Sequence, residues 1–215
     1  MNKNLKKILL AVSAALLLVA VSIGATVAYL TASTADVKNT FVFGNIGELD
    51  LDETDSDSDN NTKENEYTII PGGNITKDPV VTYTEDASNP VAVYIFLKMT
   101  PGSSWSTTDN STYTATVGST TGALSFTMAS GWTPLLSASP NKVYYRTVAA
   151  GAAATEQSYR VIANDKITVS TGITQTDVDA ATAANYKLDF KAYAIQQASF
   201  DSASAAWTAV SGSGN

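Results

Sequence analysis

Short runs of β-branched and aromatic residues, separated by clusters of Gly, Pro, Asn and Asp, recur along residues 29–215 of this 215-residue chain. Such a pattern is typical of antiparallel β-sandwiches, because each short strand ends at a turn. The most apolar of these runs covers residues 91–97, with three β-branched and two aromatic members. A continuous apolar run of this length predicts a central strand that is buried on both faces.

Two other segments alternate between apolar and polar residues, which predicts strands with one exposed face. In Glu48–Asp52 leucines alternate with carboxylates, and across residues 187–195 Leu188 and Phe190 lie on the face opposite Asp189. The remaining strand candidates are residues 41–43, 80–84, 113–117, 124–128, 143–148, 159–163 and 166–170. We therefore predict an all-β fold, a single antiparallel β-sandwich of jelly-roll type over residues 29–215.

One or two short helices are expected within this sandwich. Thr176 can cap a helix over residues 177–185, where Asp177 and Asp179 would interact favourably with the helix dipole. Ser202 can cap a turn that continues through Ala206 and Trp207. Residues 100–121, which are dense in Ser, Thr, Gly and Asn, indicate a long loop or a weak hairpin.

The first 28 residues have the three parts of a secretory signal peptide, which is expected to be helical. Three lysines precede an apolar run over residues 8–23, and small residues follow at 24–28. Thr26 and Ala28 would occupy the −3 and −1 positions, so we predict cleavage between Ala28 and Tyr29. The alternative is a retained membrane anchor, since residues 8–30 are long enough to span a bilayer.

The charge of the chain argues against anionic partners. Residues 1–28 hold three of the 13 Lys and Arg and none of the 20 Asp and Glu, so residues 29–215 carry a net charge of −10. Nucleic acids and anionic lipids both require a basic face. We therefore expect no nucleic-acid partner, and contact with a membrane only through the uncleaved signal segment.

The chain contains neither cysteine nor histidine. This composition excludes disulfides, Ser-His-Asp and Cys-His catalysis, zinc sites that use histidine and the HExxH motif of metalloproteases. Glycoside hydrolysis needs only a pair of carboxylates, but the sequence singles out no such pair. We predict that the protein is not an enzyme.

Three groups of residues, in this order along the chain, resemble the TasA and camelysin family of Gram-positive bacteria. The first group, residues 28–31, 39–41 and 44–46, is similar to the start of proteins processed by a signal peptidase of the SipW type. The second comprises residues 71–79 and the strand 93–98, and the third comprises residues 192–196, Phe200, Ala206 and Trp207. The resemblance implies a jelly-roll domain, export, and assembly into extracellular fibres of the biofilm matrix. Camelysin has been classed as a metallopeptidase, but this chain lacks the ligands for that chemistry.

In such fibres an N-terminal strand of one subunit completes the sheet of the next. Strand addition works because main-chain hydrogen bonds supply affinity and alternate side chains supply specificity. The donor would lie within the N-terminal strand segment 29–47, and its patterned apolar positions are Tyr29, Leu30, Val37, Phe41 and Phe43. The alternative is that this segment folds onto its own domain as a first strand.

The acidic segment 48–66 contains a pattern similar to a calcium-binding loop. Asp55, Asp57 and Asp59 occupy relative positions 1, 3 and 5, and Glu66 occupies position 12, which is the spacing of charged ligands in an EF-hand. Asn60 stands where an EF-hand has glycine, and the flanking segments are predicted strands rather than helices. The sequence therefore allows either weak calcium binding or a solvated acidic loop. We expect no other cofactor.

Aromatic residues suggest a second ligand class, because exposed rings on a β-sandwich can stack on sugars. Trp105 lies in a polar stretch and is the strongest candidate, and Trp132, Trp207, Tyr144 and Tyr145 could equally be core residues. The sequence thus predicts a secreted structural protein of the cell surface or biofilm matrix that forms fibres with like subunits. The alternative is a monomeric adhesin or carbohydrate-binding module with the same fold.

Overall fold

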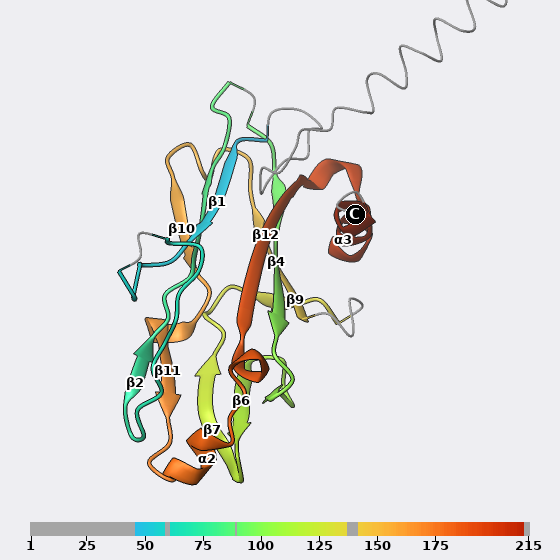
Figure 1. Cartoon of the computed structure of the whole chain (residues 1–215). Helices are drawn as coiled ribbons and strands as arrows, with labels where there is room; N and C mark the ends of the chain where they lie inside the picture. Colours follow the sequence, from blue (N-terminus) through green and yellow to red (C-terminus); the bar gives the residue numbers. More distant parts are fainter. Residues whose placement is uncertain (1–45, 59–60, 89, 137–141, 213–215) are drawn as a thin grey trace, which may run out of the picture. The chain divides into compact units, whose positions relative to one another are not determined.

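The computed structural model describes residues 46–58, 61–88, 90–136 and 142–212. These residues form a mostly β fold of antiparallel sheets with two α-helices, as the sequence predicts (Figure 1). The predicted signal segment 1–28, the donor segment with its strand at 41–43, and Asp59 lie outside the described residues. In the part of the chain that the structure describes, no helix is both long and apolar enough to span a bilayer.

Three sheets make up the described strands. The first has the order β1 (Glu48–Asp52), β3 (Val80–Thr84) and β10 (Gln157–Arg160). The second has the order β2 (Asn74–Thr76), β11 (Lys166–Val169), β7 (Thr120–Thr127), β6 (Thr112–Val117) and β5 (Trp105–Ser106). The third has the order β12 (Leu188–Gln196), β4 (Val93–Pro101), β9 (Lys142–Val148) and β8 (Thr133–Pro134).

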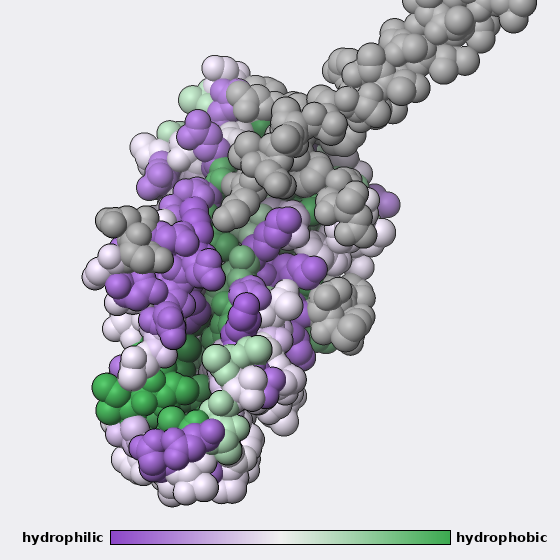
Figure 2. All heavy atoms as spheres, in the orientation of Figure 1, coloured by the Kyte–Doolittle hydropathy of each residue, from purple (hydrophilic) through white to green (hydrophobic). Residues whose placement is uncertain are grey.

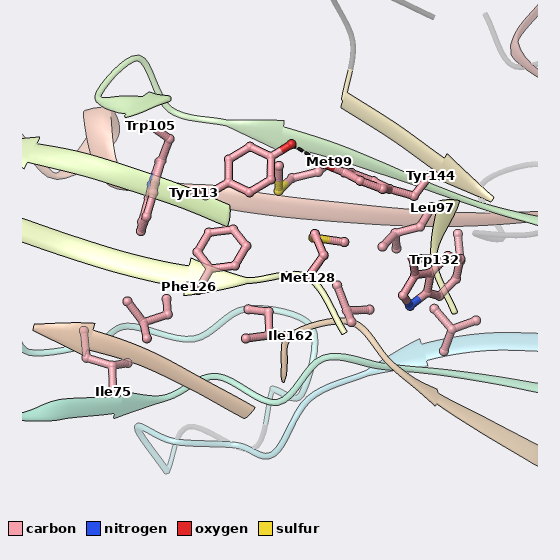
Figure 3. Packing of buried hydrophobic residues seen from close by; sticks show 14 of the residues in the cluster. Ile75, Leu97, Met99, Trp105, Tyr113, Phe126, Met128, Trp132, Tyr144 and Ile162 are labelled. Atoms are coloured by element: carbon pink, nitrogen blue, oxygen red, sulfur yellow. Dashed lines mark hydrogen bonds between the residues drawn. The ribbon is translucent and has the colours of Figure 1, made fainter. Parts of the chain in front are cut away.

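One hydrophobic core joins the three sheets in a sandwich-like arrangement. The first sheet contributes Val81 and Tyr83, the second Tyr113 and Phe126, and the third Leu97, all at most 3% exposed. Figure 3 shows side chains of this cluster pointing toward one another from several strands, with the hydroxyls of Tyr113 and Tyr144 hydrogen-bonded in its interior. Burial raises the pKa of both phenols, so these groups stay neutral in the core.

Strand β4 is buried on both faces, which confirms the prediction from its apolar run. Ile95 and Leu97 face the main core, while Phe96 packs in a second cluster with Trp207 of helix α3 (Ala203–Gly212). The Ser202 hydroxyl accepts a hydrogen bond from the Ala205 N–H at the start of α3, as predicted for a cap. The C-terminal helix therefore covers the outer face of the third sheet.

The other predicted helix has the wrong cap and the wrong length. Helix α2 spans Gln175–Asp179 and is capped by Thr174, whose hydroxyl accepts from the Asp177 N–H, while a 3₁₀ helix forms separately at Ala183–Tyr186. Asp177 occupies the third helical position and accepts from the Thr174 N–H, which completes a capping box. Both threonines have an aspartate three residues further on, but Asp177 is also held by hydrogen bonds from Ser119 and Thr120, which the local sequence does not indicate.

Candidate functional site

Strand β12 lies at the edge of the third sheet. It pairs with β4 over its full length, from Leu188 opposite Pro101 to Gln196 opposite Val93, and the sheet order places no described strand on its other side. Strand β1, which belongs to a different sheet, runs close to β12 (Figure 1). An edge strand of nine residues offers main-chain groups to an added strand.

Apolar side chains line the region between β1 and β12. Five of these side chains are half-buried against the main core. They are Leu188 and Phe190 of β12, Leu51 of β1, and Tyr67 and Ile69 from the segment between β1 and β2. We call these five residues the apolar strip. Figure 2 shows apolar surface on this side of the molecule between two hydrophilic flanks. The strip is therefore a surface where a chain with alternate apolar residues could pack.

A buried lysine organises one side of the apolar strip. The Lys77 Nζ lies 2.7 Å from Glu53 Oε1 and 3.0 Å from Oε2, and only 8% of Lys77 is exposed. The Tyr67 hydroxyl donates to Glu53 Oε2 at 2.7 Å. The ammonium lies 5.0 Å from the centroid of the Tyr67 ring and 5.9 Å from that of Phe190. Lys77 thus links the loop after β1 to β12 through one ion pair and two cation–π contacts.

Burial and the neighbouring Glu53 carboxylate raise the pKa of Tyr67, so its hydroxyl remains a donor. The adjacent Asp78 accepts from the Thr54 N–H at 3.0 Å and from its hydroxyl at 2.6 Å. These contacts fix the chain as it leaves β1.

Lys63 covers the outer edge of β1 at Leu51. Its Nζ donates to the Leu51 carbonyl at 2.7 Å and forms ion pairs with Asp50 at 2.9 Å and Asp52 at 2.6 Å. The Leu51 N–H donates to Asp50 Oδ1. Burial opposes both charges, but the hydrogen bonds outweigh it and lower the pKa of Asp50 while raising that of Lys63. With both main-chain groups of Leu51 occupied, β1 is a poor acceptor for a further strand at this position.

Of the four predicted calcium ligands, Asp55 and Asp57 accept local hydrogen bonds, and Asp59 lies outside the described residues. Asp55 Oδ1 accepts from the Ser58 N–H and Asp57 Oδ2 accepts from the Glu66 N–H. Asn65 Oδ1 accepts from both the N–H and the hydroxyl of Ser56. Within residues 46–58, 61–88, 90–136 and 142–212 no three acidic side chains are placed to hold a metal ion together.

Trp105 is buried, which corrects its prediction as an exposed platform for a sugar. It is 8% exposed, packs edge-on against Phe126 at 5.2 Å between centroids, and donates from Nε1 to the Tyr186 carbonyl at 3.0 Å. Trp132 and Trp207 are similarly buried, at 8% and 7%. The polar residues around Trp105 suggested exposure, but partners distant in the sequence enclose it.

Sequence reasoning missed Lys63 and the pair of Lys77 and Glu53. A signal was present for Lys77, because it lies between Ile75 and Pro79 in the segment that resembles the family, but the composition around Lys63 suggested only a solvated loop. Comparison of the chain with protein-family models, curated proteins and solved structures finds no match.

Proposed function

We propose that this chain is a secreted structural protein of the cell surface or biofilm matrix, without enzymatic activity. Cleavage after Ala28 by a signal peptidase of the SipW type would release Tyr29 as the new N-terminus. Subunits with a jelly-roll sandwich would then form fibres by exchanging their N-terminal strands. The resemblance of three ordered motifs to the TasA and camelysin family supports this proposal. The lack of histidine and cysteine also supports it, because the common catalytic sites that use these residues are excluded.

The observation that carries the proposal is the edge strand β12 beside the apolar strip. Phe41 and Phe43 have the two-residue spacing of one strand face, which is also the spacing of Leu188 and Phe190 on β12. The ammonium of Lys191 lies 5.2 Å from the centroid of the Tyr193 ring, so this side chain is directed along β12 toward a neighbour on the same strand. Main-chain pairing at β12 would leave the apolar residues of the donor facing the apolar strip.

Chain length is also compatible with strand exchange. At about 3.3 Å per residue, the 15 residues 29–43 extend over about 50 Å, whereas a nine-residue strand such as β12 covers about 30 Å. The donor can therefore pair along β12 and still leave residues to connect to its own domain.

The test uses the chain from Tyr29 to Asn215 in three forms: unchanged, with Phe41→Asp and Phe43→Asp, and with Thr40→Asp as a control on the opposite strand face. Electron microscopy and sedimentation velocity at increasing concentration are compared. We expect fibres from the unchanged chain and the Thr40→Asp control, and monomers from the double variant, because its carboxylates would face the apolar strip. A monomeric unchanged chain at all concentrations would overturn the proposal and favour the adhesin alternative.

A further inference from the structure

The outer face of β12 carries an alternating pattern of charges. Lys187, directly before the strand, and Asp189 and Lys191 within it lie on the face opposite Leu188 and Phe190. All three charged residues are exposed, and among the described residues none of their side chains forms an ion pair or a hydrogen bond. Figure 2 shows hydrophilic residues over β12, beside the apolar surface.

Lys191 has a like charge as its neighbour within the sheet. It lies directly opposite Lys98 of β4, and like charges at such positions are destabilising. Its ammonium contacts the ring of Tyr193 and no described carboxylate. The sheet order places no described strand at the outer edge of β12, on the side away from Lys98. A strand added at that edge could bring a carboxylate to Lys191.

The main-chain hydrogen bonds of β12 define how an added strand would pair. The Gly102 N–H donates to the carbonyl of Lys187, two residues before Asp189. Because bonding to one neighbour recurs at every second residue of an antiparallel strand, Asp189 and Lys191 also bond to β4, and Phe190 directs its main-chain groups to the outer edge. Residues of an added antiparallel strand opposite Asp189 and Lys191 would therefore form non-hydrogen-bonded pairs. In such pairs the Cα atoms are only about 4.5 Å apart, which favours contact between the side chains.

The predicted donor segment 29–43 has the complementary pattern. Its only charged residues are Asp36 and Lys38, which lie on the strand face opposite its apolar positions. We propose that the donor adds antiparallel to β12, with Lys38 of one subunit opposite Asp189 of the next. Asp36 then lies opposite Lys191, as the alternation of both strands requires. This inference rests on the strand exchange proposed above, and adds its direction and register.

The charge pattern of β12 disfavours the neighbouring registers. A slip of two residues brings Lys38 opposite Lys187 in one direction and opposite Lys191 in the other, so that like charges meet in both cases. A slip of one residue turns Val37 away from the apolar strip. The proposed register avoids both problems and leaves residues 40–47 to connect the donor to its own domain. Repulsion in the wrong registers thus makes the pairing specific.

Charge reversal tests the ion pair in the protein from Tyr29 to Asn215, with sedimentation giving the critical concentration for fibre formation. Lys38→Glu and Asp189→Lys should each raise this concentration by about threefold or more, because like charges would then lie opposite each other. The two changes together should restore it to within about twofold. Lys166→Glu makes the same change in net charge as Lys38→Glu at an exposed position of β11, and should assemble like the unchanged chain.

An engineered disulfide tests the register, because the chain contains no cysteine. The proposed register places Thr40 opposite Lys187, in a non-hydrogen-bonded pair whose spacing suits a disulfide. Thr40→Cys combined with Lys187→Cys should therefore link subunits covalently when assembled fibres are oxidised. Thr40→Cys combined with Lys191→Cys should not, since a parallel donor with Lys38 opposite Asp189 would be needed to bring those positions together.

The outcomes separate this inference from the proposed function. An unchanged chain that stays monomeric at all concentrations would overturn the strand exchange itself, and the register with it. Equal critical concentrations for the unchanged chain and Lys38→Glu would overturn the ion pair but leave strand exchange intact, as would a combined variant that is not restored. Restoration also shows that the losses in the single variants are not due to misfolding. Cross-linking through Lys191→Cys and not through Lys187→Cys would overturn the antiparallel register.

Discussion

Asp177 joins two distant parts of the chain through a single carboxylate. Its Oδ1 accepts from the N–H and hydroxyl of Ser119 at 2.7 and 2.9 Å, in the turn between β6 and β7. Its Oδ2 accepts from the Thr174 N–H and hydroxyl at the start of α2, at 3.0 and 2.7 Å, and from the Thr120 hydroxyl at 3.1 Å. Gly118 leaves space for this arrangement, since a Cβ there would lie 2.4 Å from Oδ1. One side chain thus orders both the hairpin and the helix.

Replacement of Asp177 should therefore change both stability and its dependence on pH. Hydrogen bonds from Ser119 and Thr174 hold the pKa of Asp177 far below its usual range. A lowered pKa adds stability that is present above the unfolded value of about 3.9 and is lost as the pH falls through the folded value. Asp177→Ala should lower the Tm at neutral pH and flatten its fall under acidic conditions. Asp179→Ala, which removes only a contact with Gln175, should leave both nearly unchanged in thermal unfolding followed by circular dichroism.

Single residues are also where the sequence is least informative. Trp105 was expected to be exposed because its neighbours are polar, yet its environment depends on Phe126 and on Tyr186, 81 positions away. Lys63 closes the edge of β1 through a carbonyl 12 positions earlier. Local composition contains no trace of such long-range partners, so these roles become visible only in the folded chain.

At the level of elements, the attachment of α3 to the third sheet depends on Trp207. Its ring lies 5.4 Å from that of Phe96 on β4 and 5.5 Å from that of Tyr193 on β12, between centroids. Trp207→Ala should reduce the free energy of unfolding by about 3 kcal/mol or more, because it leaves a cavity against both strands. The adjacent Thr208 is exposed, so Thr208→Ala should change stability by less than about 0.5 kcal/mol. Urea unfolding of both variants provides the comparison, and equal losses would contradict this role for α3.

Lys63 allows the closed edge of β1 to be tested separately from stability. Its ion pairs are partly exposed, so Lys63→Ala should cost less than about 1 kcal/mol. The same change frees the Leu51 carbonyl and should increase self-association of the folded protein, because an open sheet edge can pair with another chain. Sedimentation velocity at matched concentrations measures this effect. Glu64→Ala, which alters charge in the same loop without touching β1, is the control and should not increase association.

Strands were predicted well where the pattern of apolar residues within the strand itself identifies them. The apolar run of β4 and the alternation in β1 and β12 identify strands and their buried faces, because the side-chain period of a strand is two residues. The division into three sheets could not be predicted, since it depends on pairings such as β11 with both β2 and β7. The edge position of β12, and hence the candidate site, follows from that topology and not from the sequence of β12.

For the molecule as a whole, the absence of histidine and cysteine determines how stability responds to pH. No side chain has an ordinary pKa between about 5 and 8, so the Tm should be nearly constant from about pH 6 to pH 9. The ionisation of buried tyrosines at higher pH ends this range of nearly constant Tm. Burial, with a contribution from Glu85, raises the pKa of Tyr83 to about 12, and burial raises that of Tyr159 in the same direction. A raised pKa contributes stability that is fully present below the unfolded value of about 10 and is lost as the pH rises through the folded value.

The Tm should therefore fall steeply above about pH 10, as each phenol that ionises places a charge in or beside the core. Tyr83→Phe removes one such group together with its hydrogen bond to the Ile46 carbonyl. This variant should be less stable at neutral pH but should lose less of its remaining stability between about pH 10 and 12. Differential scanning calorimetry across this range, with tyrosinate absorbance recorded in parallel, measures both effects. A Tm that falls between pH 6 and 8 would mean that a different group controls the stability of the fold, because the chain contains no histidine or cysteine to titrate there.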